Sequence, residues 1–320
     1  SDTIARLKEI DHIVMLLMEN RSSDTMLGFL SMPPELGGRG RTDVDGLRDT
    51  DEFQNTYRGK TYRPVPLSEH PRFWWDPDHS HAGIVQQLSN DNGGFVESFV
   101  TNHHQVSPSI PLEKEQYGLV MGDHIAEDVW VYDHLARQFC VCDRWFSSVR
   151  GSTIPNRLYA MAGTSGGITD NPTERIPKPF DLKSIFQILK KGSWKNYISD
   201  FSSLWTLKHY RRQLWRGPID ELGAFWRDAR KGDLPPLSWI EPNYSTKTRF
   251  GSDDHPPHNI IRGQNLVGEV YNALLNGPKW EKTLFVITYD EHGGFYDHVK
   301  PPRAVDDDRY PDVHQYGVRV

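Results

Sequence analysis

Residues 283–298, TLFVITYDEHGGFYDH, decide the fold class of this chain. The run starts with seven aliphatic, aromatic and β-branched side chains, a composition typical of a strand that is buried on both faces of a parallel sheet. Two acids, Asp290 and Glu291, follow directly, and two glycines then end the regular pattern. Because ligands of open parallel sheets bind beyond the carboxyl ends of the strands, this stretch predicts both a strand and part of a functional site.

Similar apolar runs recur along the chain, and amphipathic patterns lie between them. The predicted strands are His12–Met18, Phe139–Val141, Trp194–Ile198, Leu237–Ile240 and Thr283–Tyr289. The predicted helices include His124–Gln138 with Asp123 as N-cap and Ile260–Leu275 with Gly277 as its stop signal. Strands that alternate with helices indicate an α/β fold, in which helices sandwich a mostly parallel sheet. Residues 1–320 are expected to form one domain with long polar insertions at about 38–75 and 201–256.

Composition argues against several classes of protein. The net charge of −6 speaks against general nucleic-acid binding, which needs a basic surface. One basic strip is expected to be a solvated helix face and consists of Lys208, Arg211, Arg212 and Arg216. Two cysteines, Cys140 and Cys142, exclude a disulfide framework, and no apolar run is long enough to span a membrane. The chain starts with Ser1 rather than methionine, which leaves a secreted or periplasmic location after leader removal and a cytoplasmic one both open.

Hard oxygen ligands follow two of the predicted strands. Glu19 and Asn20 come after the first strand, and Asp290 and Glu291 come after the last. Either acidic pair alone is more typical of a helix cap, but two pairs at two strand ends favour a divalent cation. Carboxylate-rich sets suit calcium, magnesium or manganese, and zinc or iron remains compatible.

A hydroxyl at a predicted helix start supplies the candidate nucleophile. Residues 150–157, RGSTIPNR, precede an apolar helical run, and Pro155 suits the first turn. Thr153 would then lie where backbone N–H groups favour a phosphate or an alkoxide. Arg150 or Arg157 would stabilise phosphoryl charge. The alternative is that Ser152 or Thr153 only caps the helix.

Histidines in polar loops are candidates for proton transfer, because imidazole titrates near neutral pH. His79, His255 and His298 all lie close to aspartates in such loops. Asp254 with His255 and His258 is the most suggestive set, since a carboxylate can orient an imidazole.

Together these motifs resemble the phosphoesterase family of bacterial and plant phospholipases C and related acid phosphatases. The matching stretches occur in the family's order and are residues 12–22, 151–157, 253–256 and 288–298. Two departures stand out: Ser23 replaces a frequent aromatic residue, and the chain stops at residues 316–320, where the family continues into a further strand and helix. The C-terminus is therefore expected to be truncated relative to the family.

The resemblance implies an alkaline-phosphatase-like core and a set of site residues. The nucleophile would be Thr153, which would also contact the metal beside Glu19, Asn20, Asp290 and Glu291. The other catalytic candidates are His79, Asp254, His255 and His258, and the substrate-binding candidates are Arg157, His292 and His298.

The expected function is metal-dependent hydrolysis of phosphate esters through a phosphothreonine, most of all phospholipase C activity on glycerophospholipids. Acid phosphatase activity on small phosphomonoesters is the first alternative, and a non-catalytic metal-binding or interaction module with the same fold is the second. The aromatic residues Phe73, Trp74, Trp75 and Trp205 favour an amphiphilic substrate and fit transient contact with a membrane surface.

Overall fold

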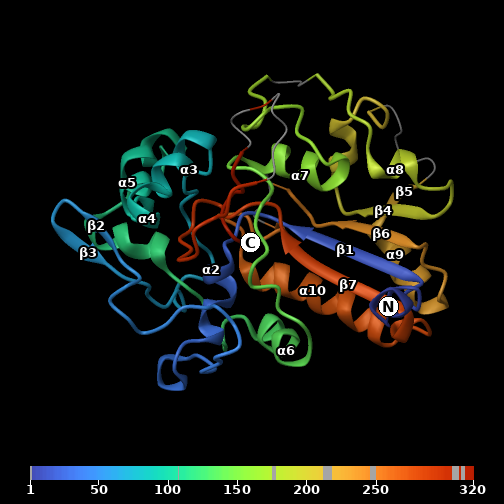
Figure 1. Cartoon of the computed structure of the whole chain (residues 1–320), viewed down its shortest axis with the longest axis horizontal. Helices are drawn as coiled ribbons and strands as arrows, with labels where there is room; N and C mark the ends of the chain where they lie inside the picture. Colours follow the sequence, from blue (N-terminus) through green and yellow to red (C-terminus); the bar gives the residue numbers. More distant parts are fainter. Residues whose placement is uncertain are drawn as a thin grey trace.

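The central sheet is parallel throughout, and five strands of it lie within the described part of the chain (Figure 1). The computed structural model describes residues 2–106, 108–174, 178–211, 218–245, 250–304, 310 and 314–320. Strand order is β5-β4-β6-β1-β7. The bounds are β1 His12–Met18, β4 Trp194–Ile198, β5 Ile219–Glu221, β6 Leu237–Glu241 and β7 Thr283–Tyr289. Because β6, β1 and β7 are parallel neighbours, their carboxyl ends meet at one edge of the sheet.

Side chains alternate along β1, and each face of the sheet has its own core. Val14, Leu16 and Met18 pack on one face with α6 (Trp130–Gln138), α9 (Leu222–Lys231) and α10 (Ile260–Leu275). Leu17 packs on the other face with α7 (Thr153–Ala162) and α8 (Ile185–Ile188). Figure 1 shows α6 and α10 below the sheet and α7 and α8 above it. The prediction of a mostly parallel sheet sandwiched by helices is therefore confirmed.

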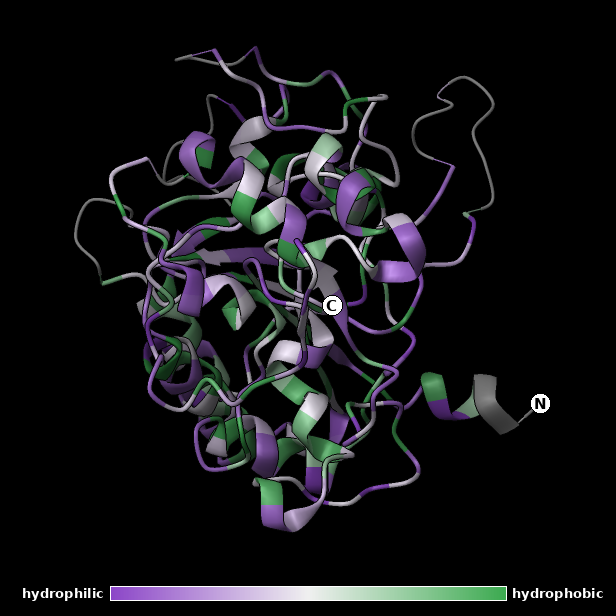
Figure 2. Ribbon diagram, turned by 90° about the vertical axis from the view of Figure 1, so that its left-hand side faces the viewer, coloured by the Kyte–Doolittle hydropathy of each residue, from purple (hydrophilic) through white to green (hydrophobic). Residues whose placement is uncertain are grey.

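A third apolar cluster lies beside the sheet and joins the segment after β7 to the region between β1 and α6. Phe295 packs there against Phe73, with ring centroids 4.8 Å apart, and near Phe95. The elements of this region are α2 Ser23–Leu27, η1 Gly28–Leu30, η2 Pro34–Leu36, β2 Asn55–Tyr57, β3 Lys60–Tyr62, α3 His81–Gln87, α4 Ser89–Asn92, α5 Phe95–Val106 and η3 Lys114–Met121. Elsewhere lie α1 Asp2–Leu7, η4 Ser203–Thr206 and η5 Trp280–Lys282. Helices in Figure 2 carry hydrophobic and hydrophilic residues side by side, as expected for elements with one face on a core.

Three predictions of local structure are corrected. Residues 139–141 form no strand: Phe139 is exposed at the end of α6, and Cys140 and Cys142 are exposed free cysteines. The helix predicted from His124 begins at Trp130, because residues 125–128 form a turn in which the Ile125 N–H donates to Asp128 Oδ2 over 3.2 Å. Asp123 is consequently buried and caps no helix.

The two predicted insertions differ in regularity. Residues 38–75 hold only the short β2–β3 hairpin, whereas 201–256 contain β5, α9 and β6 and thus contribute two strands to the sheet. The basic strip falls partly outside the described residues, since Arg212 and Arg216 are not described. Among the described segments, no helix combines the length and apolar character needed to cross a membrane.

Candidate active site

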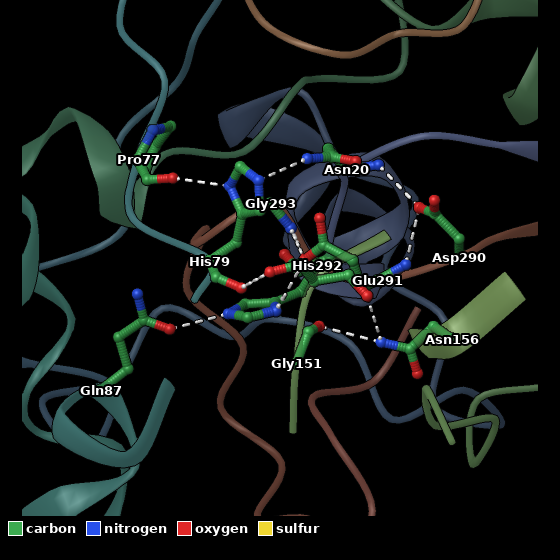
Figure 3. Close-up of polar contacts among 12 residues, drawn as sticks. Asn20, Pro77, His79, Gln87, Gly151, Asn156, Asp290, Glu291, His292 and Gly293 are labelled. Carbon is green, nitrogen blue, oxygen red and sulfur yellow. Dashed lines mark hydrogen bonds and ion pairs between the residues drawn. The ribbon is translucent and has the colours of Figure 1, made fainter. Parts of the chain in front are cut away.

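Acidic residues gather at the carboxyl ends of the three neighbouring strands. Glu19 and Asn20 follow β1, Asp290 and Glu291 follow β7, and Glu241 is the last residue of β6. Asn20 has a φ of 60°, a left-handed conformation that asparagine tolerates better than most residues. Its backbone N–H donates to Asp290 Oδ1 over 3.3 Å (Figure 3). The parallel sheet thus brings the two predicted acidic pairs together.

Arg157 is buried among these acids. Its guanidinium lies 3.0 Å from Glu19 Oε1, 2.9 Å from Glu241 Oε2 and 3.0 Å from Asp290 Oδ2. Burial, together with the negative charge of Asp290, nevertheless raises the pKa of Glu19. The predicted substrate contact of Arg157 is corrected accordingly, because its donors point at protein carboxylates that it holds in place.

Thr153 begins α7, and its side chain is half-buried. Its Oγ1 donates to Asn20 Oδ1 over 3.5 Å, so the hydroxyl faces the acidic residues. Ser152 is the N-cap, and its side chain makes no capping hydrogen bond. A Cβ at Gly151 would lie 1.9 Å from the Thr169 carbonyl oxygen, so only glycine lets the chain approach this closely before the helix begins.

Glu291 keeps one carboxylate oxygen for a further contact. Its Oε2 accepts the Gly293 N–H over 2.7 Å, whereas its Oε1 is buried without a hydrogen-bond partner among the described residues. His292 lies behind it, fully buried, with Nε2 2.8 Å from Gln87 Oε1 and Nδ1 3.4 Å from Glu291 Oε2 (Figure 3). His292 therefore supports Glu291 from inside the protein, which corrects its predicted contact with substrate.

His79 reaches the same site from the loop before α3. Its Nε2 lies 3.4 Å from the Asn20 amide nitrogen (Figure 3), and its ring centroid lies 5.8 Å from that of His255. Burial alone would lower the pKa of His79, but the negative charges of Glu291 and Asp76 outweigh it and raise the pKa to about 9. His79 and His255 thus place two neighbouring imidazoles beside the acidic residues.

The two neighbouring aspartates of the 253–258 loop have different partners. Asp253 Oδ1 lies 2.5 Å from His258 Nδ1 and accepts the His255 N–H over 3.1 Å. Asp254 has a φ of 74° and turns inward, where Oδ2 accepts the Tyr289 hydroxyl over 2.8 Å. Burial raises the pKa of Asp254 to about 7. The orienting carboxylate is therefore Asp253 rather than the predicted Asp254.

His298 belongs to a separate buried charge cluster. Its Nδ1 lies 2.8 Å from Asp24 Oδ2, and its Nε2 lies 3.1 Å from Asp45 Oδ1. Arg319 contacts Asp24 Oδ1 at 2.7 Å and Asp297 Oδ2 at 3.2 Å. His298 is thus held by aspartates of a cluster that differs from the strand-end acids, and its role in binding substrate stays a prediction.

The donor set at the strand ends fits a divalent cation. Four carboxylates gather here around the single guanidinium of Arg157 or next to it, namely those of Glu19, Glu241, Asp290 and Glu291. Of these, Glu291 Oε1 is buried and accepts no hydrogen bond from the described residues. The ligand atoms of Glu19, Asp290 and Glu291 do not all lie within 4.8 Å of one another, and Arg157 contacts both Glu19 and Asp290. The adjoining set Asp76, His79 and His255 does meet that spacing.

Sequence reasoning missed three acids of this site. Glu241 ends β6 and obeys the same strand-end rule as the predicted pairs, but the predicted strand stopped one residue before it. From the sequence, Asp254 is favoured over its neighbour Asp253, although no sequence signal distinguishes the two aspartates. Asp76 lies three residues before His79, a spacing that gives no reliable sign of contact in a loop.

Comparisons with known proteins give a family match and several named relatives. Residues 10–320 match the family model described as the phosphoesterase family. Non-specific phospholipase C6 of Arabidopsis thaliana is 36% identical over 308 residues, which cover 92% of this chain and 55% of that protein. Non-specific phospholipase C3 of the same plant is 33% identical, covering 92% and 57%, and phospholipase C B of Mycobacterium tuberculosis is 29% identical, covering 92% and 61%. The chain thus spans little more than half the length of these relatives.

Proposed function

The chain belongs to the phosphoesterase family, and we propose that it is a metal-dependent hydrolase of phosphate esters that works through a phosphorylated Thr153. The position of the Thr153 hydroxyl carries this proposal. It begins a helix, is only half-buried, and lies 3.5 Å from Asn20 Oδ1 beside the acidic residues. Backbone N–H groups at the start of α7 favour negative charge at this point, whether on an alkoxide or on a phosphate.

The cation would be held by Asn20, Thr153 and Glu291, with Glu19 and Asp290 completing its surroundings. When bound, a divalent cation supplies positive charge that favours the alkoxide of Thr153 and offsets charge on the phosphoryl oxygens. These hard oxygen ligands suit calcium, magnesium or manganese, and the nearby imidazoles keep zinc and iron among the candidates.

The residues of the chain divide the reaction into two displacements. Thr153 Oγ1 attacks phosphorus in line, and the bond between phosphorus and the leaving alcohol breaks as the new P–O bond forms. His255 is half-buried beside His79 and donates the proton that the leaving oxygen needs. A water molecule then attacks the phosphothreonine and releases Thr153, which regains its proton. Two inversions at phosphorus give net retention.

We propose a glycerophospholipid as the substrate, so that diacylglycerol leaves in the first step and the phosphorylated head group in the second. Relatives of this chain are named phospholipases C. An aromatic cluster beside the site supports an amphiphilic substrate: Phe201 packs against Trp205 and Tyr244, and Tyr244 lies under the guanidinium of Arg157. Acid phosphatase activity on small monoesters is the alternative, since the same nucleophile serves both.

Replacing Thr153 by alanine tests the nucleophile. We expect turnover of phosphatidylcholine in mixed micelles to fall by roughly 10³-fold or more. Ser152→Ala is the matched control, because Ser152 offers a hydroxyl one residue away and should keep most of the activity. Acid quenching during turnover, followed by mass spectrometry, should find phosphorylcholine attached to residue 153. Near-normal turnover by Thr153→Ala would refute the assignment.

Cation removal and a choice of substrates test the rest. Dialysis against a chelator should abolish turnover, and one of the five candidate cations should restore it; full activity of a metal-free preparation would contradict metal dependence. Faster hydrolysis of p-nitrophenyl phosphate than of phosphatidylcholine would favour the phosphatase alternative. Cation binding without turnover of either substrate would favour a non-catalytic module.

A further inference from the structure

Two arginines near the active site are each stacked on an aromatic ring that is exposed to solvent. Arg72 lies over the ring of Trp74, with its guanidinium carbon 5.0 Å from the centroid, and Arg262 lies over Phe250 at 4.7 Å. Trp74 is 40% exposed and Phe250 is 60% exposed. Large apolar side chains that remain this exposed beside fixed positive charges are typical of surfaces that meet membrane interfaces.

Three separate segments carry these residues, and backbone contacts join two of the segments. Arg72 forms an antiparallel bridge with Asn259, and the Ile260 N–H donates to the Pro71 carbonyl over 3.0 Å. Ile261, 43% exposed, follows at the start of α10. We call the group Arg72, Trp74, Phe250, Ile261 and Arg262 the aromatic–arginine rim.

The rim borders the candidate active site. A Cβ at Gly251, next to Phe250, would lie 2.2 Å from the His258 ring, so this segment packs directly on the site loop. The charge of Arg72 also acts on His258. Trp74, in the same segment as Arg72, lies two residues before Asp76, and Asp76 lies close to His79 and His255. The rim and the two imidazoles of His79 and His255 therefore lie on the same two loops.

We propose that the aromatic–arginine rim is the surface through which this protein docks on a phospholipid bilayer, an inference that rests on the proposed action on phospholipids. The three apolar side chains would enter the region between head groups and acyl chains, while the two guanidiniums pair with lipid phosphates. The chain as a whole carries a charge of −6, so the attraction to lipid phosphate at this place comes from the local pair Arg72 and Arg262 rather than from the net charge.

Docking at this place would present head groups to the nucleophile. A phospholipid that stays in the bilayer can reach Thr153 only if the site mouth faces the membrane. Because the rim lies on the loops that carry His79 and His255, the histidines that face the leaving group would come to the lipid surface together with it.

Vesicle binding measured without catalysis tests the proposal. The probes are sonicated vesicles of phosphatidylcholine, and of phosphatidylcholine with one third phosphatidylglycerol, in chelator. The double variant Trp74→Ser/Phe250→Ser should bind vesicles at least about tenfold more weakly, because it removes most of the apolar area of the rim. Arg262→Gln should weaken binding to the anionic vesicles by roughly fivefold, with a smaller effect of added salt than in the unaltered protein.

The opposite edge of the sheet provides matched controls. Phe139 and Leu275 are 47% and 41% exposed near the end of α10 that is remote from the site, so Phe139→Ser/Leu275→Ser should bind vesicles normally. Brominated lipids give a second measurement that a folding defect cannot imitate. They should quench less tryptophan fluorescence in Trp74→Phe than in the unaltered protein. In the control Trp280→Phe, the amount of quenched fluorescence should equal that of the unaltered protein.

Unchanged vesicle binding by the double variant, or equal quenching in Trp74→Phe, would overturn the docking proposal. So would a concentration-dependent dimer in sedimentation velocity that Phe250→Ser abolishes while vesicle binding stays intact, because the rim would then be covered by a second copy. The proposed function fails separately: if the unaltered protein binds vesicles through the rim but hydrolyses no phosphate ester, docking stands and catalysis does not. Turnover of soluble p-nitrophenylphosphorylcholine should stay within about twofold in the double variant, since the rim makes no contact with the reacting groups.

Discussion

Replacing Arg157 by methionine should destabilise the protein far more than any exchange of a surface arginine. The guanidinium contacts three carboxylates at 2.9–3.0 Å, and the Arg157 side chain is 2% exposed. Methionine fills similar volume but leaves Glu19, Glu241 and Asp290 without their shared cation. Removing one partner of a buried ion pair costs about 3–5 kcal/mol. Three carboxylates place Arg157→Met at the upper end of that range, a large part of the ~5–15 kcal/mol that stabilises a typical domain.

Urea unfolding in chelator, followed by the fluorescence of the ten tryptophans, gives the free energy of unfolding. Arg137→Met is the matched control: Arg137 pairs with Asp133 at 3.2 Å but is 51% exposed, so its loss should cost less than about 1 kcal/mol. Arg157→Lys should fall between the two, because one ammonium keeps the charge but cannot span three carboxylates.

A cation should separate this explanation from a simple packing defect. If excess negative charge destabilises Arg157→Met, millimolar calcium or manganese should raise its unfolding free energy more than that of the unaltered protein. Arg157→Met within about 1 kcal/mol of the unaltered protein in chelator would refute the reasoning, since buried carboxylates cannot lose their cation at so little cost.

Three further changes test other features. Burial and the charge of Asp24 raise the pKa of Asp123 to about 8, so the folded protein keeps a proton that the unfolded chain releases near pH 4. The stability that this group contributes is therefore full below about pH 4 and is lost as the pH rises to about 8. In urea unfolding, the free energy of unfolding of Asp123→Asn relative to the unaltered protein should be higher at about pH 8.5 than at about pH 5. Gly151→Ala should cost at least about 2 kcal/mol and lower turnover by displacing Thr153, because its Cβ would meet the Thr169 carbonyl; a fully active and equally stable variant would contradict this. Arg319→Met should destabilise by about 3–5 kcal/mol, and adding Asp297→Asn should recover part of the loss in thermal unfolding, whereas additive losses would show that the two groups do not interact.

Much of the fold could be predicted because its strands have sharp ends in the sequence. The predicted limits of β1, β4 and β7 agree with the structure, since each apolar run is bounded by polar or turn-forming residues. The failures lie where periodicity carries too little information. Residues 124–129 continue the apolar spacing of α6, but Asp128 closes a turn there instead. Phe139–Val141 is apolar but too short to distinguish a strand from the exposed end of a helix.

The site was predictable as far as it depends on strand ends. Glu19, Asn20, Asp290 and Glu291 meet because parallel neighbours align their carboxyl ends. Contacts that depend on the direction in which a side chain points could not be predicted from the sequence. Whether Asp253 or Asp254 faces a histidine depends on the φ of 74° at Asp254, and the sequence of two identical residues does not reveal it.

The position of β1 has a consequence for biosynthesis. Strand β1 pairs with both β6 and β7, which lie far behind it in the sequence: Ile13 pairs with Leu237 on one side and Leu284 on the other. During synthesis, the apolar segment of β1 therefore lacks both neighbours until residues 237–289 have left the ribosome. Such delayed long-range pairing slows folding and exposes the nascent chain to aggregation. Recombinant yield should accordingly depend on chaperones and on slow synthesis at low temperature.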